Sequence, residues 1–415
     1  MAIQLRPSGQ LQRRHWQILW LLGGASFFTG YDAGVVTVAL RQVRASYHLS
    51  QATASIWIGL LPLGTLPAVA LARRADRIGR RRILLVSIVG FTIATGATGL
   101  APNIATFAAC QLIAGFLLGV EGILAWTVVA EELPAASRGF GFGWLAMLSA
   151  LGTGWSAIIY AAILQPAGIS WRILYLAAVP VLVPLAILRR RLTETERFIA
   201  VRESGWLAAR WSQLLHPPHR NRLLLVCTTA FLVNLTAQAG VFVVDFMQTQ
   251  RHLSATSANL VLIGAGALAI PVLIFAGSLS DRLGRKPVCC SFLLLSVIGL
   301  VCFFMLAHST AALFGALALT YIGQFGAWPT GTGFGAELFP TALRALGGSA
   351  GTVATAVGTS ASFVLAAVLI GAGGLPRAVL VLSLGPLIAA ALIASRFPET
   401  GGRELEAISA DPAGS

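Results

Sequence analysis

A short charged phrase occurs twice in this 415-residue chain, about half the chain length apart. Residues 72–82 read ARRADRIGRRR and residues 277–287 read GSLSDRLGRKP, so Asp-Arg-x-Gly-Arg recurs after 205 positions. A Glu-x2-Pro-x3-Arg element follows each copy, first from Glu131 and then from Glu337. Each copy lies between long apolar segments, and the repeat therefore predicts a duplicated helical bundle within a membrane.

The composition agrees with a membrane protein. Apolar residues make up 56% of the chain and charged residues 11%, against roughly 25% charged residues in soluble domains. About 20 apolar residues are needed to cross ~30 Å of hydrocarbon. We therefore predict an all-α membrane protein with twelve transmembrane helices in two pseudo-symmetric six-helix bundles. The predicted spans are 16–38, 52–71, 83–101, 105–130, 142–164, 173–188, 223–247, 257–279, 289–307, 311–335, 347–370 and 378–395.

The spans divide into two halves of six. We predict an N-terminal bundle over 1–188, a cytoplasmic linker over 189–222, a C-terminal bundle over 223–397 and a cytoplasmic tail over 398–415. The middle of the basic linker has the spacing of an amphipathic helix on the inner membrane face.

The basic residues indicate the orientation. If the amino terminus is inside, cytoplasmic segments hold 24 of the 29 Lys and Arg residues. This asymmetry predicts a multi-pass protein of the cell (inner) membrane with both termini in the cytoplasm. The net charge of +14 then reflects orientation and contact with anionic lipid, and we expect no nucleic-acid partner.

The residue types that usually form catalytic and metal sites do not cluster in this sequence. All five cysteines fall in apolar spans, and the six histidines lie at helix ends or in loops. No nucleophile motif or phosphate-binding glycine loop is visible. The sequence therefore predicts no metal, no cofactor and no enzyme. A monomer is the default expectation.

Four sequence features resemble the major facilitator superfamily, in particular its sugar-porter branch and related metabolite transporters. They are GYDAGVVTVAL at 30–40, both D-R-x-G-R-[RK] loops, both E-x6-R elements, and PETGGRELEAI at 398–408. The resemblance implies alternating-access transport through the predicted twelve-helix fold. It also implies a cytoplasmic gate, a salt-bridge latch closed in the outward-open state, made by Asp76, Arg80, Glu131, Arg138, Asp281, Arg285, Glu337 and Arg344.

Three acidic residues lie within apolar spans, namely Asp32, Glu121 and Asp245, and no Lys or Arg lies deep in a span. A charge buried in the bilayer costs at least ~2.5 kcal/mol, which makes these carboxylates functional candidates. Asp32 is predicted to carry a proton, because proton-linked family members keep an acid in the GYD motif. Glu121 is predicted to share this task. The alternatives are a solvated vestibule for Asp32 and an interhelical polar bond for Glu121. Asp245 is assigned to the rim or gate.

The substrate-binding pattern of the sugar porters is mostly absent. Gln111 replaces the arginine that the family pairs with the acid of the first helix, and Ala146 replaces a glutamine of the fifth helix. The remaining candidates for substrate binding are Gln111, Trp126, Asn234, Gln238, Trp328 and Asp245. Each tryptophan has packing or lipid contact as its alternative role. The absence of a deep cation disfavours a strongly anionic substrate.

We therefore predict a secondary active transporter that moves a sugar, polyol or related metabolite by proton-coupled symport. Its expected partners are the solute, protons and the lipid bilayer. One alternative is a proton-coupled exporter of organic cations or drugs, although residues 141–160 lack the proline that drug antiporters usually carry in the fifth helix. An uncoupled uniporter is another, because Gln111 carries no charge. The short tail disfavours a transporter-like sensor.

Overall fold

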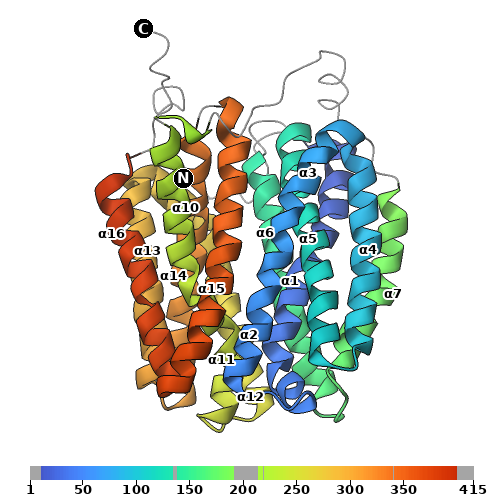
Figure 1. The fold of residues 1–415 in the computed structure, drawn as a ribbon, viewed down its shortest axis with the longest axis vertical. Helices are drawn as coiled ribbons and strands as arrows, with labels where there is room; N and C mark the ends of the chain where they lie inside the picture. Colours follow the sequence, from blue (N-terminus) through green and yellow to red (C-terminus); the bar gives the residue numbers. More distant parts are fainter. Residues whose placement is uncertain (1–10, 134–137, 191–213, 218, 340, 400–415) are drawn as a thin grey trace. The chain divides into compact units, whose positions relative to one another are not determined.

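A computed structural model describes residues 11–133, 138–190, 214–217, 219–339 and 341–399. Within these ranges the chain is helical and contains no strand (Figure 1). Most of the predicted linker and the tail beyond Glu399 lie outside them, and so does the predicted amphipathic helix.

The chain divides into two compact units. Residues 1–49 and 60–206 form the first, and residues 50–59 and 207–415 form the second. The main helices of the first unit are α1 (Arg13–Ser46), α3 (Leu66–Ile78), α4 (Arg80–Leu100), α5 (Ile104–Glu132), α6 (Arg138–Ile159) and α7 (Arg172–Arg189). Those of the second are α2 (Gln51–Leu60, up to Gly59), α10 (His219–Val233), α11 (Ala237–Thr249), α12 (Ala255–Leu283), α13 (Arg285–Val301), α14 (Thr310–Glu337), α15 (Thr341–Leu382) and α16 (Leu384–Arg396).

Ten helical stretches of the described chain are long and apolar enough to cross a membrane. The last of them, 346–396, contains two spans, because α15 breaks at Gly374 with a φ of 80° before α16 follows. The 34-residue α1 is not among these stretches, but it covers the first predicted span, 16–38. Several helices extend beyond the apolar segments: α1, for example, continues to Ser46. The backbone hydrogen bonds of a helix do not require apolar side chains once the chain has left the hydrocarbon.

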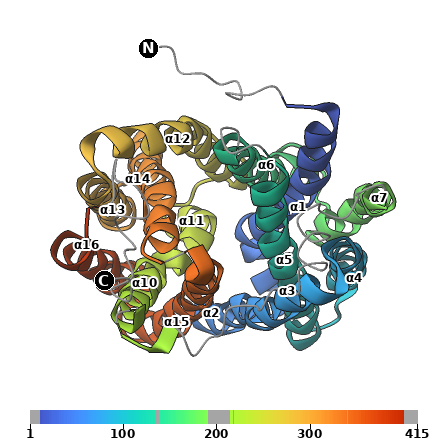
Figure 2. The same ribbon diagram turned by 90° about the horizontal axis from the view of Figure 1, so that it is seen from above.

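Helix packing follows the same plan in both units. In the first unit α1 packs on α6, α4 packs on α5 and α7, and α3 packs on α5. In the second unit α10 packs on α15, α13 packs on α14 and α16, and α12 packs on α14. Figure 2 shows the members of these pairs next to one another. The sequence repeat therefore extends to the packing of the helices.

Glycines at matching positions permit the closest helix crossings. A Cβ atom on Gly152 of α6 would overlap the carbonyl oxygen of Phe27 on α1. In the second unit, a Cβ on Gly358 of α15 would lie 2.5 Å from the carbonyl oxygen of Phe231 on α10. Shifts of 204 and 206 positions relate the two phenylalanines and the two glycines. Both crossings thus use a small residue to let two backbones touch.

The repeated charged loops also share a backbone conformation. Gly79 has φ 106° and ψ 135°, and Gly284 has φ 96° and ψ 146°. Side chains disfavour a positive φ, which explains why both turns use glycine.

Two spans are interrupted by 3-10 helix. The segment Leu61–Thr65 separates α2 from α3, and Asn234–Thr236 separates α10 from α11. The first interruption falls where the chain passes from the second unit back into the first.

Candidate functional site

Asp32 lies near the middle of α1 and is 8% exposed. Its Oδ1 accepts a hydrogen bond from Nε2 of Gln111 on α5, at 3.2 Å. The same amide nitrogen lies 3.5 Å from Oγ1 of Thr98 on α4, at the limit of a hydrogen bond. Asp32 and Gln111, whose positions the family resemblance pairs, therefore meet inside the first unit, where α1, α4 and α5 come together.

Two tyrosines also belong to this region. The hydroxyl of Tyr31 donates to the carbonyl oxygen of Leu174 on α7, at 2.8 Å. The neighbouring Tyr175 is 1% exposed and packs edge-on against Phe107, one helical turn before Gln111. Within the described chain its buried hydroxyl has no hydrogen-bond partner. The groups assembled around Asp32 are thus hydroxyls and an amide, which leave the carboxyl free to bind or release a proton without breaking an ion pair.

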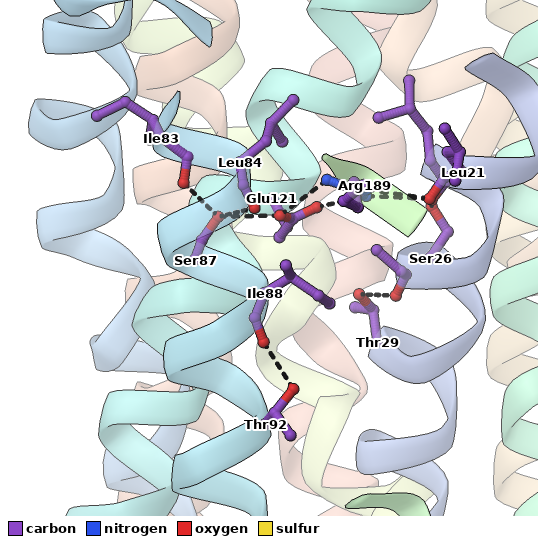
Figure 3. A network of polar contacts seen from close by, with 12 residues as sticks. Leu21, Ser26, Thr29, Ile83, Leu84, Ser87, Ile88, Thr92, Glu121 and Arg189 are labelled. Carbon is purple, nitrogen blue, oxygen red and sulfur yellow. Dashed lines mark hydrogen bonds and ion pairs between the residues drawn. The ribbon is translucent and has the colours of Figure 1, made fainter. Parts of the chain in front are cut away.

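Glu121 lies in a different environment, two to three helical turns along α5 from Gln111. Its Oε1 accepts from Oγ of Ser87 on α4 at 2.9 Å and from Nη1 of Arg189 on α7 at 3.1 Å (Figure 3). Oε2 lies 2.9 Å from Nη2 of Arg189, although no donor points at it with hydrogen-bond geometry. The exposed fractions of the Arg189 and Glu121 side chains are 0% and 2%. The contact is therefore a fully buried ion pair.

Arg189 was missed by the sequence analysis. The prediction put it in the cytoplasmic linker and expected no deep cation, whereas the structure makes it the last residue of α7 and buries its side chain. Its Nε and Nη2 both donate to the carbonyl oxygen of Leu21 on α1, at 3.2 and 3.1 Å. The available signal was Glu121 itself, because a deeply embedded carboxylate needs a partner.

The second unit holds a separate group of polar side chains. Asp245 is fully buried in α11, and its Oδ2 accepts from Nε2 of Gln51 on α2 at 2.7 Å. Gln238, also on α11, is fully buried, and neither atom of its amide has a hydrogen-bond partner in the described chain. Its backbone N–H donates to Oγ of Ser362 on α15, at 3.0 Å. Buried amides without partners are rare in proteins, so Gln238 is a candidate for binding water or a ligand.

The other candidates for substrate binding are less enclosed. Asn234 is partly buried, and its Oδ1 lies 3.4 Å from Oγ1 of Thr359, a long hydrogen bond. Trp126 and Trp328 are 41% and 53% exposed, unlike the buried Gln111 and Gln238.

The structure describes the side chains of only two members of the predicted cytoplasmic gate, Arg80 and Arg285. Arg80 is 8% exposed. The side chains of Asp76, Glu131, Arg138, Asp281, Glu337 and Arg344 lie outside the described part.

The structure describes two contacts of acidic residues near these motifs. Glu399, in the family-like tail, accepts from the backbone N–H groups of Arg285 at 2.8 Å and Lys286 at 3.2 Å. It therefore caps the start of α13, where a carboxylate is favourable. Nη2 of Arg14 and Oε2 of Glu132, 2.8 Å apart, join the beginning of α1 to the end of α5.

No group of His, Cys, Asp and Glu in the described residues could hold a metal ion. The arrangement instead provides buried polar sites between helices, one with a carboxyl that has neutral partners and one with an unpaired amide.

Comparisons with known proteins identify the family. A model of the Major Facilitator Superfamily matches residues 22–245 and 224–412. The niacin transporter of Acinetobacter baylyi is 25% identical over 429 residues, covering 95% of this chain and 96% of that protein. The ectoine/proline transporter of Corynebacterium glutamicum is 28% identical over 325 residues, covering 68% and 62%.

Solved structures give the same fold. The inward open conformation of a xylose transporter from E. coli matches with a TM-score of 0.79 at 16% identity, covering 95% of this chain and 99% of that one. A crystal structure of a D-xylose-proton symporter matches with a TM-score of 0.77 at 18% identity, covering 94% and 99%. Since the family model spans nearly the whole sequence, this chain belongs to the Major Facilitator Superfamily and is a multi-pass membrane transporter of small organic solutes.

Proposed function

We propose that this protein is a proton-coupled symporter in which Asp32 carries the proton. The observation that carries the proposal is the position of Asp32, buried in α1 with the neutral amide of Gln111 as its hydrogen-bond partner. A carboxyl in such a site can exist as the acid or as the carboxylate, and neither form leaves a buried cation unpaired. Binding and release of one proton can therefore accompany each transport cycle.

The proposed substrate is a sugar, polyol or related metabolite without a strong net negative charge. Gln238 and Asn234 supply uncharged donors and acceptors on one broken span. The buried cation of the first unit, Arg189, is already paired with Glu121. The relatives named above carry niacin, ectoine and proline, all small polar solutes, and this range supports a general metabolite transporter.

Several further assignments belong to the same proposal. The protein would lie in the cell (inner) membrane as a monomer, with both termini in the cytoplasm, as the distribution of Lys and Arg favours. The eight charged residues of the repeated motifs would form the cytoplasmic gate. Trp126, Trp328 and Asp245 remain candidates for contact with the solute or its entrance.

Uptake into proteoliposomes tests the proposal. An inward proton gradient would be imposed and sugars, polyols, organic acids and quaternary amines supplied in turn. We expect one class to accumulate, and accumulation to collapse with an uncoupler. The Asp32→Asn variant should exchange labelled for unlabelled solute but should not accumulate it. Accumulation by Asp32→Asn at the wild-type level would refute the assignment.

An uncoupled uniporter is the second candidate, and Gln111 is the observation that favours it. The neutral amide occupies the position where the family usually has an arginine, so it cannot link the charge of Asp32 to a cation. In that case uptake would run only down the solute gradient and would not depend on pH.

A further inference from the structure

Two polar connections join α1 to α5 in the first unit, one at each end of a shared segment. The first joins Asp32 directly to Gln111. The second runs from the Leu21 carbonyl of α1 through Arg189 to Glu121 of α5. On each helix the two connections are ten or eleven residues apart, which corresponds to about 15–16 Å of helix. The helices are antiparallel along this segment, because the higher-numbered residue of α1 pairs with the lower-numbered residue of α5.

We propose that Glu121 and Arg189 form a permanent, charge-neutral clamp that holds α1 in register with α5, and that Arg189 is thereby a positioning residue for Asp32. The proposal rests on the function proposed above. It assigns Glu121 a role other than the proton carriage predicted from the sequence. Through Ser87, Glu121, Arg189 and Leu21 the clamp reaches α4, α5, α7 and α1 (Figure 3).

The burial of the pair makes the clamp permanent. Both side chains are almost completely inaccessible, and Arg189 has Glu121 as its one acidic contact in the described chain. Protonation of Glu121 would leave a guanidinium buried with only neutral acceptors, which is far more costly than an intact pair. Glu121 therefore keeps its charge while the transporter works.

Asp32 differs in this respect. The groups that interact with it are Gln111 of α5, Tyr31 of its own helix and Tyr175 of α7, and Thr98 of α4 lies beyond the Gln111 amide. The residues of α6 that pack most closely on this part of α1 are small and uncharged, such as Ser149 and Gly152. No cation is among these groups. The intact pair carries no net charge, so at about 15 Å it acts only weakly on the charge of Asp32.

The geometry links the clamp to the proton site. Arg189 binds α1 through the backbone of Leu21, so loss of the guanidinium would allow α1 to slide or rotate against α5. A small movement would change the 3.2 Å hydrogen bond between Asp32 and Gln111 and with it the proton affinity of the site. A pair that only stabilised the fold would shift the pH profile solely through the charge left unpaired, and in opposite directions for the two single variants.

Four variants test this proposal: Glu121→Gln, Arg189→Gln, the double variant, and as a control Thr92→Val on α4, where the hydroxyl donates to the Ile88 carbonyl of the same helix. The thermal midpoint of each purified protein and the pH profile of its solute uptake would be measured. Each single charge variant should lower the thermal midpoint and move the midpoint of the pH profile by about half a pH unit or more. The double variant should restore most of the thermal midpoint and most of the pH midpoint, and Thr92→Val should move the pH profile little.

Three outcomes would overturn the proposal. If Glu121→Gln kept its thermal midpoint but lost proton-driven accumulation, Glu121 would be a proton carrier. If the double variant lowered the thermal midpoint by the sum of the two single decreases, the two residues would not act as a pair. If the single variants lowered only the thermal midpoint, the clamp would have no positioning role. A wild-type protein that transports without pH dependence would refute the proposed symport instead, and the thermal data would still show whether the pair exists.

Discussion

The crossing of α1 and α6 is the most sensitive point of the first unit to a small change in volume. Replacement of Gly152 by Ala would introduce a methyl group inside the van der Waals radius of the Phe27 carbonyl oxygen. That oxygen belongs to the backbone and cannot rotate away as a side chain could. The two helices would have to separate by about 1–2 Å to restore ordinary contact.

The expected cost follows from three effects. Overpacking of this kind costs about 1–3 kcal/mol. Separation would also weaken the 3.0 Å hydrogen bond from Oγ1 of Thr153 to the carbonyl oxygen of Gly30, worth about 1 kcal/mol. The higher helix propensity of Ala offsets about 0.5–1 kcal/mol of this destabilisation. The net loss is about 2 kcal/mol, which corresponds to a fall of about 4–8 °C in Tm for a unit of this size.

Gly154 provides a matched control on the same helix. Apart from its chain neighbours and the backbone of its own helix, no atom lies within 4 Å of the position where its Cβ would be, so Gly154→Ala should leave Tm unchanged or raise it slightly. Both variants would be purified in the same detergent, and their unfolding followed by fluorescence. Equal Tm values for the two variants would refute the reasoning, because the predicted difference comes entirely from the Phe27 contact.

Two further predictions concern the second unit. Glu399→Ala removes the acceptor for the N–H groups of Arg285 and Lys286 and should cost about 0.5–2 kcal/mol, whereas Glu399→Gln should recover part of the loss in a thermal melt. A wild-type Tm for Glu399→Ala would argue against the cap. Gln51→Leu removes a donor from the buried Asp245 and should lower the free energy of unfolding by about 1–3 kcal/mol, with Ile56→Ala, at an exposed position of the same helix, as control. Equal Tm values for these two variants would contradict a stabilising role of the hydrogen bond between Gln51 and Asp245.

The scaffold was predictable because its signals are local and occur twice. Apolar length identified the spans, and the repeated phrase identified two turns whose glycines, Gly79 and Gly284, adopt nearly the same backbone angles. The assignment of residues 50–59 to the second unit was not predictable in this way. It depends on contacts such as that of Ser55 with the Phe363 carbonyl, 308 positions away.

The candidate site was predictable only in part. Residue type and motif position singled out Asp32 and Gln111. Their hydrogen bond joins residues 79 positions apart, and the periodicity of a single helix cannot predict a contact of that kind. The burial of Arg189 was not predicted, for a different reason. Arg189 begins a run of three arginines, and the rule that places such runs at the membrane surface applies to the run as a whole. The side chain of its first member, Arg189, lies among the helices because Glu121 and the Leu21 carbonyl accept hydrogen bonds from it there.

The two units share a backbone plan but differ in the chemistry inside it. The shifts that match the glycine crossings and the Glu-Pro-Arg elements place Thr236 opposite Asp32, Leu317 opposite Gln111 and Ala327 opposite Glu121. The second unit thus has no counterpart of either connection between α1 and α5, and the corresponding α10 and α14 are not among its main helix pairs. Its own buried carboxylate, Asp245, corresponds to Arg41 in the first unit. The helix pairs that do recur, such as α4 with α5 and α13 with α14, pack in the described part of the second unit without such an ion pair. The restriction of the two polar connections to the first unit supports a role specific to that unit, and proton coupling through Asp32 is the role we propose.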